Sequence, residues 1–297
     1  MINTRILEQR LGWGRHDPSQ PADAPTPETR PIRHEPLLQG RIRPLPGMHR
    51  ASPRRADTEA LWQDLPIAAQ SLDTIDARHG VLHSIDRNSA AAAALDQLRA
   101  QLMRLVRANN WRRIGVTSPR RGAGRSFIAA GLAASLSRLE TLRVLLIDMD
   151  LGAPDLAKKL GLRPPGPLES LLGDETAPEE HLLRIGTNLA LALNDTPIPR
   201  AADLVQDPAV VDAMRHLMEL LAPDVAIFDL PPLLGDALST SLLPQLDAVL
   251  LVADGTATQA QDITECERIL EGQVPLLGVI LNKSEDPDPR DRGAARV

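Results

Sequence analysis

Tyrosine is absent from the 297-residue chain, and aromatic side chains make up only 2% of it. Hydrophobic residues reach 43%, which is enough for a sizeable core, so that core must be aliphatic. With a single cysteine, Cys266, the chain cannot form an internal disulfide, and this is typical of a reducing compartment. We expect Cys266 to be a small buried hydrophobe. The net charge of −6 argues against a general nucleic-acid binder.

Long apolar runs are also missing. The run AVLLVA at 248–253 is far shorter than the ~20 residues that a membrane-spanning helix needs. The N-terminal sequence MINTRILEQRLGWGRHD lacks the uninterrupted apolar core of a secretory signal. We therefore expect a cytoplasmic protein with no transmembrane segment of its own.

Residues 1–87 differ in composition from the rest, because prolines and arginines recur through them. Such a stretch cannot bury enough apolar surface to offset its ordering entropy, so we expect a largely disordered tail. Short helices near Thr4–Leu11 and Thr58–Leu65 are expected to interrupt it. The arginines could contact a membrane surface or an acidic partner, but acids lie between them, which favours a solvated tail. A folded domain is expected at 88–286, followed by a disordered tail at 287–297.

Short apolar runs alternate with amphipathic segments from Ser89 onward. Near-continuous Val, Ile and Leu strands between helices indicate a parallel sheet that is covered on both faces. The expected fold is therefore α/β, with a doubly wound, mostly parallel sheet. The expected strands are Ile114–Thr117, Arg143–Ile147, Leu189–Leu193, Val225–Phe228, Ala248–Val252 and Leu276–Leu281. The expected helices are Ser89–Asn109, Ser126–Leu139, Ala153–Leu160, Pro208–Leu221, Ser239–Leu243 and Gln259–Glu271.

The segment RRIGVTSPRRGAGRSF is close to a phosphate-binding loop, because an apolar strand runs into a glycine-bearing turn and a helix opens at Ser126. Gly122 and Gly124 let the backbone turn its N–H groups onto one point, and the helix adds its positive end. In the general pattern G-x-x-x-x-G-K-[ST], Pro119 stands at the first glycine and Arg125 at the lysine. Taken alone, the loop is equally compatible with an ordinary strand-turn-helix connection.

Polar side chains end three other expected strands. Asp148 and Asp150 follow RVLLI, Asp229 follows VAIF, and Asn282 follows GVIL. Ligands in such sheets bind beyond the carboxyl ends of the strands, so we expect these residues at one site. The aspartates could hold a nucleotide's Mg²⁺ and orient an attacking group, and the amide of Asn282 could read an adenine edge. Asp150 alone could instead cap the following helix, but four such features in this order favour a site.

This order of motifs resembles the P-loop proteins of the MinD/ParA type, and most closely the bacterial tyrosine kinases (BY-kinases) of capsule and exopolysaccharide synthesis. The similarity covers roughly residues 89–285. It rests on GVTSPRRGAGRSFIAAGLAASLS, VLLIDMDLGAPDLAKKLGL and VAIFDLPPLL. A proline-marked loop at Asp195–Pro208, DTPIPRAADLVQDP, is typical of the polysaccharide-associated members.

The resemblance implies a sheet of P-loop NTPase type that binds ATP and Mg²⁺ and forms homo-oligomers. It also implies a membrane-embedded chain-length regulator and polymerase as partners, which would bring the protein to the periphery of the inner membrane. No nucleic-acid partner is expected. By the same resemblance, Ser126, Asp148 and Asp229 hold Mg²⁺, and Asp148 and Asp150 serve the catalytic step. The nucleotide-binding residues that it implies are Arg120, Arg121, Gly122, Ala123, Gly124, Arg125, Ser126, Phe127 and Asn282.

The chain departs from the family pattern at several points. Arg125 replaces the loop lysine, and a planar, forked guanidinium is longer than a compact ammonium. Gly152 stands where the family carries an arginine, and Ala93, Asp96 and Arg99 stand at the E-x-x-R-x-x-R positions used in ring assembly. The family's tyrosine cluster has no counterpart, since this chain contains no tyrosine and cannot phosphorylate itself on one.

These observations order three functions. The first is a regulatory partner of an exopolysaccharide machine with a degenerate BY-kinase-like domain. The second is an active ATPase, or a tyrosine kinase that phosphorylates other proteins. The third is a partition-type positioning ATPase that dimerises through Arg120, which stands where MinD/ParA proteins keep a lysine that reaches across the dimer; a solvated loop arginine is the simpler interpretation of Arg120.

Overall fold

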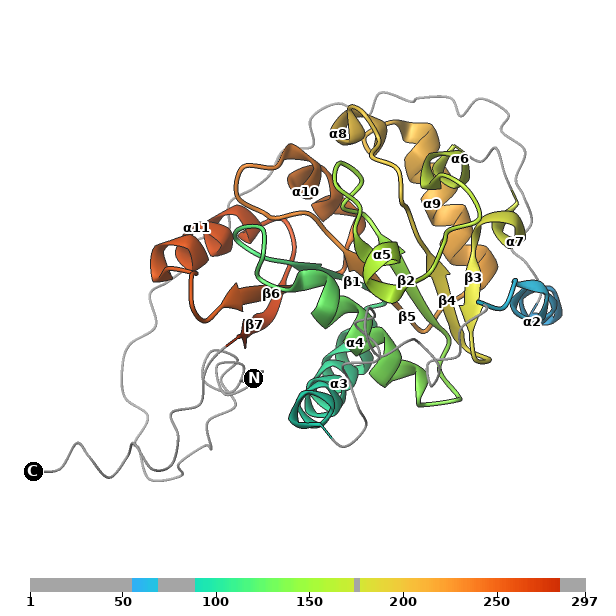
Figure 1. The fold of residues 1–297 in the computed structure, drawn as a ribbon, viewed down its shortest axis with the longest axis horizontal. Helices are drawn as coiled ribbons and strands as arrows, with labels where there is room; N and C mark the ends of the chain where they lie inside the picture. Colours follow the sequence, from blue (N-terminus) through green and yellow to red (C-terminus); the bar gives the residue numbers. More distant parts are fainter. Residues whose placement is uncertain (1–54, 69–88, 174–176, 284–297) are drawn as a thin grey trace, which may run out of the picture.

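A seven-stranded sheet forms the centre of the described part of the protein (Figure 1). The structure, a computed structural model, describes residues 55–68, 89–173 and 177–283. The strand order is β3-β4-β2-β5-β1-β6-β7, and every neighbouring pair is parallel except β3 with β4. The strands are β1 (Arg113–Thr117), β2 (Val144–Asp148), β3 (Leu183–Ile185), β4 (Leu189–Ala192), β5 (Val225–Asp229), β6 (Ala248–Asp254) and β7 (Leu276–Asn282). The predicted mostly parallel α/β fold is confirmed.

Helices cover both faces of this sheet. They are α2 (Arg55–Asp64), α3 (Ala90–Asn109), α4 (Arg125–Ser137), α5 (Leu156–Leu160), α6 (Leu168–Leu172), α7 (Pro178–His181), α8 (Ala201–Leu204), α9 (Pro208–Leu221), α10 (Ala237–Leu242) and α11 (Ala260–Leu270). Side chains of a strand alternate between the two faces. Val144 and Leu146 of β2 therefore pack in the core that α3, α4 and α5 close, while Leu145 and Ile147 pack in the core beneath α9, α10 and α11. This arrangement is the predicted doubly wound one.

The four short elements β3, α6, α7 and α8 are not among the expected ones. Each has three to five residues, which is too few for a hydrophobic period to show. The six expected strands and the longer expected helices are all present, with ends that differ by no more than three residues. Cys266 is buried in α11 as predicted, and burial raises the pKa of its thiol to about 12. Across the described ranges, no helix has the length and apolar character needed to cross a membrane.

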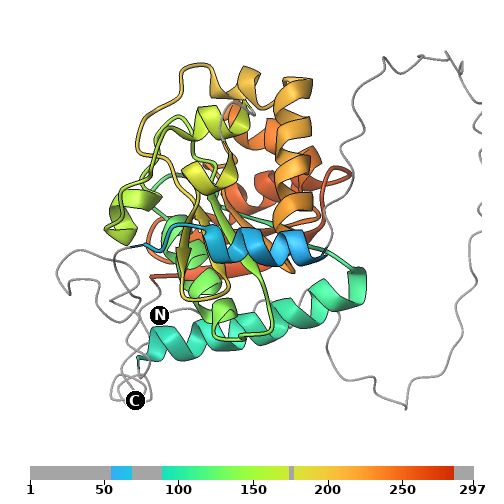
Figure 2. The same cartoon turned by 90° about the vertical axis from the view of Figure 1, so that its right-hand side faces the viewer.

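Part of the expected N-terminal tail packs on the domain. The helix predicted near Thr58–Leu65 is present as α2, and Figure 2 shows it crossing near one end of α9. Trp62 and Leu65 are buried, and the N–H of Ala68 donates to the carbonyl of Arg184 in β3 at 2.8 Å. The segment 55–68 is therefore not disordered, because its apolar side chains have a surface to cover. The helix predicted near Thr4–Leu11 and the tail predicted at 287–297 lie outside the described residues, and the remaining domain limits stay predictions.

The topology brings three chain segments together at the carboxyl ends of the central strands. β5 lies between β1 and β2, so the loop that follows β1 neighbours the residues that end β2 and β5. In this register Asp148 lies directly beside Asp229. Parallel strands point their carboxyl ends the same way, and ligands of doubly wound sheets bind at that edge. The predicted site residues are thus gathered where a ligand would be expected.

Candidate nucleotide site

The loop between β1 and α4 has the glycine conformations that the sequence predicts. Gly122 and Gly124 adopt φ values of 89° and 93°, in the left-handed region that residues with a Cβ atom rarely adopt. Gly124 also has no room for a side chain, because a Cβ there would lie 2.2 Å from the Nδ2 of Asn282. The loop is therefore closely packed against the end of β7 and leads directly into α4.

Two consecutive residues at the end of β7 tie this loop in place. The Nδ2 of Asn282 donates to the carbonyl of Ala123 at 2.9 Å, and the Nζ of Lys283 donates to the carbonyl of Gly122 at 2.7 Å. Lys283 also pairs with Asp254 at 2.8 Å. The Asn282 amide thus uses one N–H on the loop, and its contact with an adenine stays a prediction. Lys283 was not expected here, because a lysine after a strand has no distinguishing pattern.

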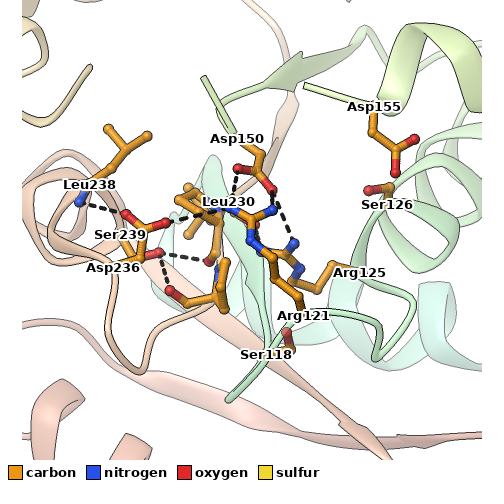
Figure 3. A network of polar contacts seen from close by, with 12 residues as sticks. Ser118, Arg121, Arg125, Ser126, Asp150, Asp155, Leu230, Asp236, Leu238 and Ser239 are labelled. Atoms are coloured by element: carbon orange, nitrogen blue, oxygen red, sulfur yellow. Dashed lines mark hydrogen bonds and ion pairs between the residues drawn. The ribbon is translucent and has the colours of Figure 1, made fainter. Parts of the chain in front are cut away.

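Arg125 points into the protein. Its side chain is 8% exposed, its Nη1 donates to the carbonyl of Leu230 at 2.6 Å, and its Nη2 to the Oδ2 of Asp150 at 3.1 Å. Arg121 grips the same carboxylate with Nη1 at 2.9 Å and Nη2 at 3.2 Å, but is half exposed. Figure 3 shows both guanidinium groups turned toward Asp150, with Ser126 and Asp155 to one side of the network. The positive charge at the lysine position is therefore already partnered inside the chain.

Asp148 and Asp229 are buried carboxyl groups at the ends of paired strands. Burial raises the pKa of Asp148 well above its usual value, and the nearby charges of Asp229 and Asp150 raise it further. The carboxyl group of Asp148 accepts hydrogen bonds from the backbone N–H of Asp150 at 3.2 Å and from that of Leu156 at 3.3 Å. For Asp229, burial raises the pKa to about 6, although the Ser126 hydroxyl and the Arg125 charge act the other way. One buried oxygen of Asp229, Oδ1, has no hydrogen-bond partner.

A cavity of about 280 Å³ opens between the loop and these acids. Its size is close to the lower end of ordinary ligand pockets, about 300 Å³. Its lining contains seven of the predicted residues and three unpredicted ones, Ala153, Asp155 and Lys159. The predicted lining residues are Arg121, Gly122, Gly124, Arg125, Ser126, Asp150 and Asp229. The unpredicted three follow the second aspartate motif, and only the return of α5 toward α4 brings them here.

The other predicted site residues lie outside this lining. Asp148 is buried without lining the cavity, Ala123 is buried in the loop, and Phe127 packs against the apolar core. Arg120 points toward α11 and pairs with Asp262 at 3.0 Å. This guanidinium lowers the pKa of the Asp262 carboxyl. The roles of these residues toward a nucleotide stay predictions.

The residues present fit a nucleotide-bound Mg²⁺. Mg²⁺ at such sites takes one or two protein ligands and completes its shell with phosphate oxygens and water. The unpartnered Oδ1 of Asp229 beside the hydroxyl of Ser126 supplies that number. Among residues 55–68, 89–173 and 177–283, no three His, Cys, Asp or Glu side chains form a metal site by themselves.

The sheet order, the glycine loop that opens a helix and the acids at adjacent strand ends define a P-loop class of nucleotide-binding protein. The model of the CobQ/CobB/MinD/ParA nucleotide binding domain matches residues 114–294, and the chain belongs to this family. Tyrosine-protein kinase YwqD of Bacillus subtilis (strain 168) is 27% identical over 212 residues, which cover 67% of this chain and 86% of that protein. An EpsB protein of Ralstonia solanacearum, a candidate tyrosine-protein kinase by its name, is 28% identical over 191 residues. That match covers 64% of this chain but only a quarter of the relative, 25%.

Two solved structures have the same fold. The chimerical protein CapA2B2 superimposes with a TM-score of 0.63 at 20% identity, over 78% of this chain and 100% of that one. The kinase domain of the Escherichia coli tyrosine kinase ETK gives a TM-score of 0.61 at 19% identity, over 75% and 91%. The predicted resemblance to the MinD/ParA type and to bacterial tyrosine kinases is confirmed.

The raised pKa of Asp229 predicts a pH-dependent stability. A carboxyl whose pKa is raised on folding destabilises the folded state once it ionises, so stability falls as pH rises from about 4 through about 6. The side-chain amide of an Asp229→Asn variant cannot ionise, and the variant should exceed the parent at pH 7.5 by about 2–3 kcal/mol. Near pH 3.5 the two proteins should be equal.

Denaturant unfolding of parent and variant across pH 3.5–7.5 measures this difference. Asp212→Asn is the matched control, because Asp212 is exposed on α9 and should give a flat difference. An Asp229→Asn variant that is less stable than the parent at pH 7.5 would contradict the prediction.

Proposed function

We propose that the chain binds ATP with Mg²⁺ in this cavity and acts as a regulatory partner of an exopolysaccharide or capsule machine, with little phosphoryl transfer of its own. The partner would be a membrane-embedded chain-length regulator and polymerase, which would hold the protein at the inner membrane. One observation carries the proposal: Arg125, at the position of the phosphate-gripping lysine, is buried and bonded to Asp150 and Leu230.

The binding part of the proposal uses the loop and two side chains. The backbone N–H groups around Gly122 and Gly124, with the N-terminus of α4, would hold phosphate oxygens. Ser126 and Asp229 would ligate Mg²⁺, which supplies positive charge to the phosphates when bound. The buried position of Asp229 strengthens such an interaction, because little water competes there.

The regulatory part of the proposal follows from the ion pairs that Asp150 already forms with Arg121 and Arg125. Asp150 is held by two arginines, so its carboxylate is not free to accept a proton from an attacking group. Displacing a reacting group by about 1 Å lowers the reaction rate on the order of 100-fold. A longer, planar guanidinium cannot place its charge where the ammonium of a lysine would lie. This chain also lacks tyrosine, which leaves it no such residue to modify on itself.

The link to polysaccharide systems rests on family resemblance and on one loop. The sequence of the segment Asp195–Pro208 resembles a proline-marked loop of polysaccharide-associated members of the family. In the structure the N–H of Ile198 in this loop donates to the carbonyl of Leu151 at 2.8 Å, next to Asp150. A partner that binds this loop would therefore be coupled to the site by a single backbone contact.

Binding and turnover measurements test the proposal on the full chain. We expect calorimetry to show binding of ATP with Mg²⁺, and ATP hydrolysis by the parent to be no faster than by Asp229→Asn. Radiolabelled ATP should transfer no phosphate to candidate partner proteins. The Arg125→Lys variant serves as the positive control for the assay conditions, since it restores the usual loop residue. Absence of ATP binding would overturn the proposal.

An active ATPase or a kinase for other proteins is the second candidate. It is favoured by the pair formed by Ser126 and Asp229, because an unpartnered buried carboxylate oxygen beside a hydroxyl is suited to a catalytic Mg²⁺. Hydrolysis or transfer by the parent well above the Asp229→Asn background would support it. A partition-type ATPase has less support, since Arg120 pairs with Asp262 of its own chain.

A further inference from the structure

We propose that Lys159 provides the ammonium group that binds the terminal phosphates of the nucleotide, in place of the loop lysine whose position Arg125 occupies. This inference rests on the proposed function, because it assigns a residue to the same cavity. Lys159 belongs to α5, a different element from the loop, and no general loop pattern includes it.

The position of Lys159 suits this role. Its side chain lines the cavity together with Gly122, Gly124 and Ser126, and its Nζ lies 3.5 Å from the Oγ of Ser126. Asp229 lines the same cavity. The ammonium therefore shares one cavity with the loop that would hold phosphates and the acid that would hold Mg²⁺.

Three cationic side chains line the cavity, and they differ in how firmly an acid holds them. Arg125 pairs with Asp150 where both are buried, with side chains 8% and 9% exposed. Breaking a buried pair leaves an uncompensated charge and is strongly unfavourable. Arg121 grips the same carboxylate through two nitrogens. Neither arginine can turn to a phosphate without giving up Asp150.

Lys159 is held by an exposed acid, whereas both arginines are held by a carboxylate whose side chain is only 9% exposed. It pairs with Asp155 one helical turn earlier, and the two side chains are 34% and 51% exposed. Exposed pairs of this spacing contribute little stability, so a phosphate can replace Asp155 at small cost. Asp155 can then turn to water, because half of its side chain already faces solvent. Lys159 is thus the cation that a triphosphate can recruit.

The neighbouring lysines of the described chain do not share these properties. Lys158 is exposed and is not part of the cavity lining. Lys283 donates to the carbonyl of Gly122 and pairs with Asp254, so its ammonium stabilises the loop backbone and is not directed at a bound phosphate. Lys158 therefore provides a matched control, with the same side chain one residue away on the same helix.

Calorimetric titration of the full chain with ATP and Mg²⁺ tests the assignment. We expect Lys159→Met to weaken ATP binding by about 10- to 100-fold, the range for loss of a charge-assisted hydrogen bond, and Lys158→Met by less than about twofold. Binding of AMP should change little in either variant, because AMP lacks the terminal phosphates. Asp155→Asn should tighten ATP binding by about two- to fivefold, since it removes the competing carboxylate.

A second measurement uses a reactive nucleotide. An acyl-phosphate derivative of ATP acylates a lysine amine beside the phosphates, and the amide forms as ATP leaves. Peptide mapping should find the label on Lys159, and excess ATP should prevent it. A label on Lys158 or Lys283 in place of Lys159 would overturn the assignment.

The outcomes separate this inference from the proposed function. If the parent binds ATP and Lys159→Met binds it equally well, the assignment is wrong and the proposed function stands. If neither parent nor variants bind ATP, the proposed function fails and the assignment fails with it. Equal thermal unfolding of parent and both lysine variants is expected, because both side chains reach solvent.

Discussion

Replacing Trp62 by alanine is expected to lower the free energy of unfolding by about 3–5 kcal/mol, the usual range for a buried tryptophan. Its side chain is 3% exposed between α2 and α9, so truncation would leave a large cavity. The indole N–H donates to the carbonyl of Leu221 at 2.8 Å, and the Arg143 guanidinium lies 5.8 Å from the ring centre. Both contacts are lost in the variant, and the carbonyl of Leu221 loses its indole donor.

Chemical denaturation of the full chain measures this change, with Ile67→Ala as the control. Ile67 follows the same helix but is 68% exposed, so its truncation should change stability by no more than about 0.5 kcal/mol. A Trp62→Ala variant as stable as the control would show that α2 does not belong to the folded unit. The expected result would move the start of that unit from residue 88 to the beginning of α2.

The position of α2 illustrates what composition conceals. Residues 1–87 are rich in proline and arginine, which predicts disorder for the stretch as a whole. Within it, Trp62 and Leu65 of one short segment are buried, and burial of a large aromatic side chain favours docking of that helix in a way that average composition does not indicate. The sequence predicted the helix from its local pattern, but the surface that receives the segment is assembled from α9, Arg143 and β3, far along the chain.

The long elements of the sheet were predictable for a physical reason. Strands buried on both faces, such as β5 and β6, appear in the sequence as continuous apolar runs between helices. β3 does not, because it is a three-residue edge strand that pairs antiparallel with β4. Its direction depends on the loop from α7, which carries no periodic signal. Very short elements such as β3 thus depend on tertiary contacts that the local sequence does not encode.

The candidate site divides in the same way. Gly122, Gly124 and Asp229 were predicted because backbone conformation and strand ends fix where they lie. The direction of the Arg125 side chain was not, since motif position alone places it among the phosphates. Asp155 and Lys159 were missed because α5 reaches the cavity only after the chain turns back over α4.

Removal of the Asp150 carboxylate should be costly because of Arg125. In Asp150→Ala the buried guanidinium keeps only the carbonyl of Leu230, and we expect a loss of about 3–5 kcal/mol in the free energy of unfolding. Adding Arg125→Met to this variant removes the unpaired charge and should recover much of the loss. Arg121 pairs with the same carboxylate, but its side chain is 50% exposed. Arg121→Met should therefore lower the free energy of unfolding by about 1 kcal/mol or less.

A double-mutant cycle on Asp150 and Arg125 measures their coupling, and the same variants can be titrated with ATP. If Arg125 is a structural cation, Arg125→Met loses stability while its ATP affinity stays near that of the parent. The opposite pattern, unchanged stability with lost ATP binding, would make Arg125 a phosphate ligand and contradict its buried pairing. The two quantities can be separated because the buried bonds of Arg125 to Asp150 and Leu230 contribute to stability, whereas a phosphate contact would contribute to ATP affinity. The first pattern would mean that the charge at the lysine position acts on the fold, and the ammonium that we propose for the nucleotide then comes from another element, α5.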